Sequence, residues 1–496
     1  MKRIFGLLSI VVAITAFLQA QTNSSQLAGE RTSVDLTVYN SNLALVREER
    51  TMNLAKGFNR VVVPDIPATI DGTSLHFSSL TDASAVRVLE QNFQYDLVHQ
   101  AKLLEKYVGK EVEFVRLNEE TKKEYTVRAR LLSTGWQAQP GINQYYSGQM
   151  IAEVNGKIEI NPAGWLVLPS LPEGLILKPQ LEWLVTNSRV GEHKTEISYL
   201  ASQLSWSCNY VVLLNAEDTK ADLTGWVTLK NNSGTTFKNA GLKLVAGDVN
   251  IVQEPQYNYG ALAMKARSAD EAAQFTQKEL FEYKLYTLQR RTDLADNETK
   301  QIELTSARNV QSTKIFIYDG LGASWRGWYN NYSYREQGSF GQQSNPKVGV
   351  YVTFRNEEKA GLGIPLPKGK VRVYKRDDDG KEQFIGEDEI DHTPKDEEIR
   401  LYLGNAFDIV GSRAQTNFKT VVSGHIYDET FEIKVRNHKK EAVEVVIYEH
   451  PWRWNEWDIT SSTTKWEKVD QTTMKIPVRI APDEEKVVKY TIRYSW

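Results

Sequence analysis

Residues Thr228–Asn250 read TLKNNSGTTFKNAGLKLVAGDVN, which is an alternating strand, a polar turn at Asn231 and a second apolar strand. The same order recurs in GVYVTFRNEEKAG around Asn356 and in FEIKVRNHKKEA around Asn437, each followed by another apolar strand. Period-two alternation with Asn and Gly turns is typical of antiparallel β-sandwiches. The sequence therefore predicts sandwich construction over this part of the chain.

The recurring asparagine suggests a structural device. An Asn side chain can bond nearby backbone where a strand leaves its sheet, and Asn tolerates left-handed backbone. The stretch ends in Ala246-Gly247-Asp248, with no phosphate loop, metal ligands or nucleophile partner around it. We expect a tight turn there, with Asp248 capping local backbone.

The length of 496 residues exceeds one hydrophobic core and predicts three or four domains. Residues 1–20 pair a basic start, Lys2 and Arg3, with an apolar run ending near Ala20. This pattern predicts a secretory signal peptide, with an N-terminal membrane anchor as the alternative. After its removal we expect a chain that does not span a membrane.

Charge and cysteine content narrow the function classes. Loss of Lys2 and Arg3 takes the formal net charge from -3 to -5, which argues against a nucleic-acid binder. The single cysteine, Cys208, lies in SWSCNYVVLL and is most simply a small buried residue on a strand.

The domain organisation follows from changes in pattern. Residues 21–93 predict an N-terminal β domain. A short amphipathic helix within Tyr95–Val108 opens residues 94–183, whose closely spaced strands predict a small barrel or curled sheet. Two sandwich parts follow, at 184–345 and 346–496. A segment near 260–285 breaks the β pattern and is either a helix or a mobile insertion. The predicted fold class is mainly β: several antiparallel sandwiches, one small barrel-like domain and one or two short helices.

Several motifs together resemble a known bacterial family. SYLASQLSWSCNYVVLL, WVTLKNNSGTTFKNAGLKLVAGDVN, YTLQRRTDLADNETKQIEL and GIPLPKGKVRVYKRDDDGKEQFIGEDEIDHTPKDEEIRLYLGNAFDI are similar, in order, to the domain of unknown function 4139 family. The resemblance runs from about Leu184 to the C-terminus. Members are often described as mucoidy-inhibitor-like, which implies a role in the cell envelope. Many relatives carry a coiled coil before this domain, whereas this chain has the small β region. The family supplies no catalytic residues to carry over.

Motifs for chemistry are missing from the sequence. The seven histidines form no HExxH pair, there is no CxxC, and no nucleophile elbow or phosphate loop occurs. Asp377-Asp378-Asp379-Gly380 suggests calcium, but an EF-hand glutamate is absent, and a hairpin turn is the favoured interpretation. We therefore expect no metal, no cofactor and no catalytic residue. A glycosidase pair assembled only in the fold would escape this reasoning.

The candidate binding residues lie in one aromatic segment. ASWRGWYNNYSYREQGSF (323–340) sets aromatic side chains among Gly, Asn and Ser, without strand alternation. Such loops are typical of recognition surfaces, and their rings also stack on sugars. The alternative is that the loop folds back and seals a domain edge. The predicted ligand- or partner-binding residues are Trp325, Trp328, Tyr329, Tyr332 and Tyr334.

Two other aromatic features favour packing. Trp452, Trp454 and Trp457, with Trp466 after them, have partly strand-like spacing, so core or inter-domain packing is expected ahead of binding. The last strand, Val487–Trp496, alternates well. Since the chain lacks the many lipid-facing strands of an outer-membrane barrel, we expect it to close a sandwich.

These observations predict an exported, non-enzymatic interaction or scaffolding protein of the bacterial envelope, with the periplasm favoured over the extracellular space. The expected partner is an envelope protein or a glycan. The alternative is a carbohydrate-active hydrolase or a carbohydrate-binding protein that uses aromatic loops.

Overall fold

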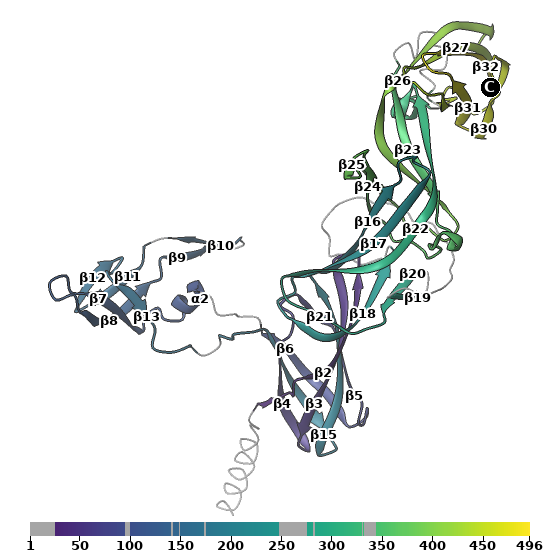
Figure 1. Ribbon diagram of the computed structural model, residues 1–496. Helices are drawn as coiled ribbons and strands as arrows, with labels where there is room; N and C mark the ends of the chain where they lie inside the picture. The colour runs from purple at the N-terminus through teal and green to yellow at the C-terminus, as the bar shows by residue number, and fades with distance from the viewer. Residues whose placement is uncertain are drawn as a thin grey trace, which may run out of the picture.

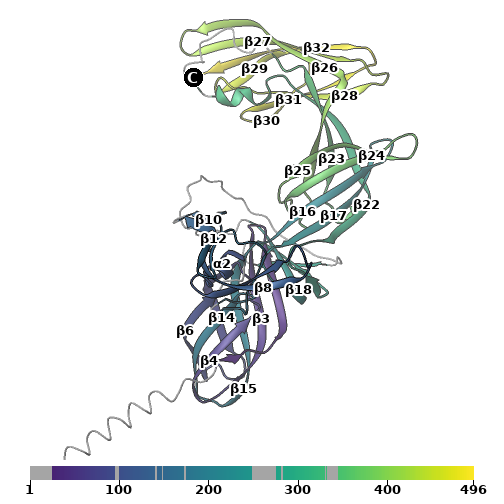
Figure 2. The same ribbon diagram turned by 90° about the vertical axis from the view of Figure 1, so that its left-hand side faces the viewer.

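The computed structural model describes residues 25–94, 100–139, 142–147, 149–172, 175–247, 275–280, 283–329, 331 and 344–496. These residues form an elongated row of three β units, with a small domain projecting to one side (Figures 1 and 2). The prediction of a mainly β chain is confirmed, and its strands form several sheets. Among the described residues, no helix combines the length and apolar character needed to cross a bilayer.

The N-terminal unit contains two sheets. The smaller sheet has the order β1 (Gln26–Leu27), β4 (Gly57–Pro64), β14 (Gln180–Asn187) and β6 (Val86–Gln94). The larger sheet has the order β19 (Phe275–Leu280), β20 (Tyr283–Leu288), β18 (Phe237–Ala246), β2 (Arg31–Tyr39), β3 (Leu43–Leu54), β15 (Gly191–Ser202) and β5 (Ile70–Ser79), with β21 (Thr292–Leu294) beside β18. The strands β15, β18, β19, β20 and β21 come from the part of the sequence that resembles the family, after about Leu184. They nevertheless lie in the larger sheet of the N-terminal unit.

The small domain is inserted between β6 and β14. It contains the predicted short helix, α2 (Gln100–Glu105), which buries Ala101 and Leu104. Its sheet has the order β12 (Lys157–Ile160), β11 (Ile151–Val154), β8 (Glu124–Ser133), β7 (Glu111–Leu117) and β13 (Trp165–Val167), and a hairpin of β9 (Trp136–Gln139) and β10 (Ile142–Ser147) lies apart from it. Arg116 on β7 reaches Glu159 on β12, which shows that the sheet is strongly curled, and no ladder among the described residues closes it.

The remaining strands form one long sheet that runs through two units. Its order is β25 (Glu382–Ile390), β24 (Gly369–Arg376), β16 (Leu204–Leu214), β17 (Lys220–Asn231), β22 (Glu298–Asp319), β23 (Lys347–Arg355), β26 (Glu398–Val422), β27 (Ile426–Asn437), β32 (Glu485–Ser495) and β29 (Trp457–Ser462). The middle unit consists of β25, β24, β16, β17, β22 and β23, in that order in the sheet, together with the first half of β26. A second layer of β28 (Val443–Glu449), β31 (Thr473–Ile480) and β30 (Glu467–Asp470) covers the last strands and completes the C-terminal sandwich.

Two strands are shared between the middle unit and the C-terminal sandwich. The first half of β22 pairs with β17, and its second half pairs with β23 and β28. The first half of β26 pairs with β23, and its second half pairs with β27. Figure 1 shows both strands passing from one unit into the next. Two continuous strands therefore join the units, although the ladders change partner at the junction and the β23–β26 ladder shifts register there.

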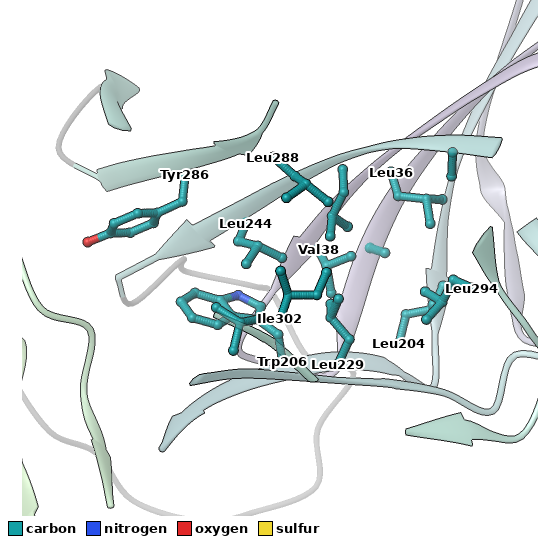
Figure 3. Close-up of a cluster of buried hydrophobic side chains, with 14 of the residues drawn as sticks. Leu36, Val38, Leu204, Trp206, Leu229, Leu244, Tyr286, Leu288, Leu294 and Ile302 are labelled. Carbon is teal, nitrogen blue, oxygen red and sulfur yellow. The ribbon is translucent and has the colours of Figure 1, made fainter. Parts of the chain in front are cut away.

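The core follows from the alternation of the strands. In β16, every second residue from Leu204 to Leu214 is buried, which gives the sheet one apolar face. The largest cluster of buried apolar residues is continuous through the N-terminal and middle units, and Figure 3 shows part of it, with Trp206 and Leu244 near Tyr286. Cys208 lies in this core, 1% exposed, as predicted. Val488, Tyr490, Ile492 and Tyr494 of β32 are buried in the C-terminal sandwich, so the last strand closes a sandwich as expected.

The three recurring asparagines are all buried, and the amide of each bonds to backbone, as predicted. Asn231 accepts from the Ser233 N–H, and Asn356 accepts from the Gly363 N–H and donates to two carbonyls. The Asp377 carboxylate likewise accepts backbone N–H groups inside the β24–β25 hairpin, which confirms the turn.

The segment near 260–285 is described only at its end. Residues 275–280 and 283–288 are the strands β19 and β20, so the helix considered there is not present in those residues. Residues 260–274 lie outside the described residues, as do the predicted leader and Asp248.

Candidate interaction surface

The aromatic segment begins with a turn at the end of β22. The Asp319 carboxylate accepts hydrogen bonds from the Leu321 and Gly322 N–H groups, at 3.1 and 2.7 Å. Gly322 has a φ of 56°, a left-handed conformation that glycine adopts without a steric penalty. The 3-10 helix η1 (Gly322–Gly327) follows, and it carries Trp325 on the C-terminal sandwich.

The side chains of η1 pack on the segment after β28. Trp325 stacks on His450, with ring centroids 4.6 Å apart and planes 12° apart. Trp328 meets Trp452 edge to face at 5.7 Å, and Tyr329 meets Trp325 in the same way at 6.0 Å. The side chains of Trp325, Trp328 and Tyr329 are all half-buried. The segment therefore folds back on the sandwich, while part of each ring remains exposed.

These contacts bring three of the five predicted binding residues together, namely Trp325, Trp328 and Tyr329. Tyr332 and Tyr334 lie outside the described residues. The geometry fits both interpretations of the sequence, because partly exposed rings can seal an edge and also take part in binding. Their role in binding stays a prediction.

Most of the tryptophan side chains in the segment after β28 pack against other residues of the C-terminal sandwich. Trp452 and Trp457 are buried, at 2% and 6% exposure, and Trp454 packs edge to face on Trp496 at 6.2 Å. Trp466 lies 6.2 Å from Trp457 and is 37% exposed. The expected packing role is confirmed for the buried pair.

Aromatic contacts continue from η1 to the C-terminal residue. The Arg453 guanidinium lies 4.6 Å from the Trp452 ring and 5.0 Å from Phe418. Tyr427 then stacks between Phe418 and Trp496. We call this set the aromatic row; its members are Trp325, Trp328, Tyr329, Trp452, Arg453, Phe418, Tyr427, Trp496 and Trp454. The row joins β26, β27 and β32 to η1.

Ionised side chains lie buried beneath the aromatic row. Arg413 donates to both oxygens of Glu449 at 2.9 Å, and Tyr490 donates to the same carboxylate. Arg453 donates to Glu429. Burial is the largest single influence on the pKa of Arg413 and would lower it, but the charge and hydrogen bond of Glu449 together with Tyr490 and Glu429 outweigh burial, so the pKa is raised. Each buried charge therefore has an ion-pair partner, as burial requires.

This buried network was missed by the sequence reasoning, although a signal was present. Tyr427, Phe431 and Ile433 mark the apolar face of β27, and Glu429 occupies the same alternating register. An acid in a core register indicates a buried partner of opposite charge. The identity of that partner, Arg453, depends on the fold.

A second buried charge cluster occupies the N-terminal unit. Arg50, 1% exposed, donates to Glu48 and to the carbonyls of Gly29 and Pro64. Arg31 donates to the same Glu48. The cluster ties β2 and β3 to neighbouring backbone, which is a structural role.

The described residues offer few features suited to chemistry. They include no group of three His, Cys, Asp or Glu side chains placed to hold a metal ion. Burial raises the pKa of Cys208 to about 12, so its thiol is protonated at neutral pH. The site is thus an aromatic surface over a fixed charge network, suited to stacking and packing contacts.

The fold and surface define a mainly β protein of several sheets, whose middle unit and C-terminal sandwich share two strands. The chain belongs to the family called Domain of unknown function (DUF4139), whose model matches residues 195–496, more than half of the chain. This confirms the resemblance found in the sequence. No curated protein matches the chain.

Proposed function

We propose that this chain is an exported, non-enzymatic interaction or scaffolding protein of the bacterial cell envelope, in the periplasm ahead of the extracellular space. The observation that supports this role best is the sharing of β22 and β26 between two units. Both strands run from the middle unit into the sandwich that carries the aromatic row. An elongated body whose units share strands, and which presents one surface at its far end, suits a scaffold.

The contact surface in this proposal is the exposed part of the aromatic row around η1. Aromatic side chains bury large areas at low entropic cost, and partly buried rings are already ordered before binding. The partner is an envelope protein, with a glycan as the second choice because the same rings can stack on sugars.

The rival proposal, a carbohydrate-active hydrolase, needs two carboxylates facing a substrate. The two acids buried beneath the aromatic row do not meet this need. Glu429 and Glu449 are at most 1% exposed, and each is bound by a guanidinium. Their geometry favours a role in holding the sandwich together.

The test compares the full chain with a Trp325→Ala/Trp328→Ala variant. Photo-crosslinking in envelope extracts and binding to a glycan array are measured in parallel. The proposal expects the variant to lose a discrete protein crosslink while its thermal unfolding stays within a few degrees of the parent. Capture of glycans alone would favour the rival, and collapse of the unfolding transition would assign both rings to packing.

A matched control keeps the packing but changes the exposed ring edge. Trp325→Phe and Trp328→Phe retain aromatic contacts with His450 and Trp452. Partner capture should fall less in these variants than in the alanine variants, since a smaller ring preserves part of the contact area.

A further inference from the structure

His450 follows β28 directly and contacts both η1 and the end of β22. Its ring stacks on Trp325, with centroids 4.6 Å apart and planes 12° apart. The side chain is 11% exposed, so most of the ring is away from solvent. Its ring nitrogens therefore depend largely on partners within the protein.

Both ring nitrogens of His450 face oxygen atoms that accept hydrogen bonds and cannot donate them. Nδ1 lies 3.1 Å from the backbone carbonyl of Thr472, and Nε2 lies 3.4 Å from Oδ2 of the Asp319 carboxylate. A neutral imidazole has one N–H and one lone pair, so it donates to one oxygen and turns its lone pair toward the other. The imidazolium has two N–H groups and donates to both. The arrangement is complete when His450 is positively charged.

His193 in the N-terminal unit shows the contrast. It is fully buried, with Nε2 at 2.9 Å from the Arg189 carbonyl and Nδ1 at 3.0 Å from the Ser79 hydroxyl. A hydroxyl can donate to the lone pair of Nδ1 while Nε2–H donates to the carbonyl. Both nitrogens of His193 are therefore satisfied in the neutral ring, whereas those of His450 are not.

Acidic groups surround the ring of His450. Besides Asp319 on β22, Asp470 at the end of β30 accepts a hydrogen bond from the Thr472 N–H at 2.7 Å. Burial would raise the pKa of Asp470, but hydrogen bonds from Thr472 and Thr473 and the charge of His450 outweigh it, so the pKa lies below its ordinary value of 3.8. Two carboxylates close to one imidazole favour its charged form.

The basic side chains on the neighbouring elements have other contacts. Arg326 of η1 lies 5.8 Å from the ring centroid of the tryptophan of η1. On β31, Lys475 pairs with Glu467 at 2.9 Å. The charge of Glu449, next to the imidazole in the chain, is bound by Arg413. The charges that bear on the ring nitrogens are thus mainly those of the two aspartates.

Asp319 connects the protonation of His450 to the start of η1. Its Oδ1 accepts the N–H groups of Leu321 and Gly322, while its Oδ2 faces Nε2 of His450. Loss of the Nε2 proton turns a lone pair toward the carboxylate that fixes this turn. It also removes the attraction between a cation and the Trp325 ring face. Two contacts that hold η1 on the sandwich therefore weaken together.

We propose that His450 is a pH-sensitive latch for η1, which orders the exposed part of the aromatic row in mildly acidic conditions and releases it as the pH rises. An ordinary imidazole changes charge at about pH 6.5, so the change falls near neutrality. The order of η1 stands independently of the proposed function. The consequence for binding, a better ordered contact surface in acid, rests on the proposed function.

The test measures hydrogen exchange of the full chain at pH 5.5 and 7.5, in the peptide that contains η1. Rates are corrected for the pH dependence of intrinsic exchange. His450→Phe keeps a ring against Trp325 but has no ring nitrogens. Asp319→Asn keeps the Oδ1 acceptor for the turn and places an amide donor toward Nε2. Circular dichroism and thermal unfolding confirm that both variants are folded.

The proposal expects the protection of η1 in the parent to fall about fivefold from pH 5.5 to 7.5. In His450→Phe the change should be below about twofold. In Asp319→Asn the direction should reverse, because the amide donates to the neutral ring and faces an N–H of the charged one. If Asp319→Asn does not fold, ¹⁵N NMR of the labelled histidines provides a second measurement. The signals that His450→Phe removes should titrate in parallel with the protection of η1 in the parent.

Three results overturn the latch. One is equal protection of η1 at both pH values in the parent. Another is that His450→Phe keeps the pH dependence of the parent. The third is that Asp319→Asn changes in the same direction as the parent. Crosslinking at both pH values separates this inference from the proposed function. A crosslink that depends on Trp325 and Trp328, with pH-independent protection, rejects the latch alone. Reversal of the pH dependence in Asp319→Asn without any captured partner supports the latch and counts against the binding role.

Discussion

Asn231 and Asn437 occupy the same position in two hairpins and make the same hydrogen bonds. Each Nδ2 donates to the carbonyl four residues later and to two successive carbonyls of a distant turn. These carbonyls are Thr235, Leu294 and Ala295 for Asn231, at 2.9, 3.3 and 3.0 Å, and Glu441, Ile480 and Ala481 for Asn437, at 2.8, 3.3 and 3.0 Å. The amide has two hydrogens, so one bond of each set is shared.

The distant turns are equivalent as well. The Ala295 N–H donates to the Glu298 carboxylate, and the Ala481 N–H donates to the Glu484 carboxylate, at 2.7 and 2.6 Å. Both turns include a left-handed residue before the glutamate, with φ near 56°. The chain thus uses one strand–turn–strand module twice, once in the middle unit and once in the C-terminal sandwich.

Replacing either asparagine should destabilise its own unit. Asn231→Ala or Asn437→Ala leaves buried carbonyls and an N–H without partners, and we expect a loss of roughly 2–4 kcal/mol in the free energy of unfolding. Denaturant titration followed by hydrogen exchange locates the loss to the mutated module. The control is Asn232→Ala at an exposed neighbour, with a change within about 0.5 kcal/mol. Equal effects at Asn231 and Asn232 would contradict the role assigned to the amide.

The asparagine turn illustrates what sequence reasoning can reach. Alternation and turn residues are local, so the strands, the turns and the buried asparagine side chain could be predicted. The carbonyls at Leu294 and Ile480 lie far along the chain, and only the fold brings them to the amide. The stacking of Trp325 on His450 escaped prediction for the same reason.

The partners of buried charged residues are the second feature that could not be predicted from the sequence. The alternating register of β27 places Glu429 on the apolar face, but the choice of Arg453 as its partner depends on how the loop after β28 returns. Likewise, Arg413 and Glu449 lie on strands that pair with different neighbours. Local pattern can indicate that a buried charge needs a partner, and it cannot supply the geometry.

The buried Arg413–Glu449 pair should show strong coupling. Arg413→Met or Glu449→Leu alone leaves an unpaired buried charge, and each should cost roughly 3–5 kcal/mol. The double variant should cost less than the sum by more than about 1 kcal/mol, because neither charge remains. A double-mutant cycle by urea titration measures this difference. The exposed pair Arg436–Glu485 serves as control, with single changes below about 1 kcal/mol. Simple additivity at Arg413 and Glu449 would argue against a direct interaction.

Asp218 should make the middle unit sensitive to acid. Burial alone would raise the pKa of Asp218, but Lys314 and Lys375 outweigh it, so the pKa lies below its ordinary value of 3.8. A lowered folded-state pKa contributes stability that is complete above the unfolded pKa and disappears as pH falls through the folded pKa.

The difference in unfolding free energy between the parent and Asp218→Asn should therefore be constant from neutral pH to about 5 and shrink below about 4. Denaturant titrations across pH 2 to 7 test this, with Asp379→Asn in the exposed β24–β25 turn as control. A difference that does not change with pH would show that Asp218 acts through packing and neutral hydrogen bonds alone.

Cys208 should resist alkylation in the folded protein. Burial raises the pKa of its thiol from 9.0 to about 12, which lowers the thiolate fraction at neutral pH by about three orders of magnitude, and the side chain is 1% exposed. Labelling by iodoacetamide should therefore be slow in buffer and rapid in denaturant, as followed by intact mass. The matched control moves the thiol by one residue on β16, to the exposed outer face, in a Cys208→Ala/Ser207→Cys variant. That thiol should react in buffer at close to the rate of a free thiol. Rapid labelling of Cys208 in buffer would mean that the core around β16 opens readily, because neither burial nor the raised pKa would then protect the sulfur.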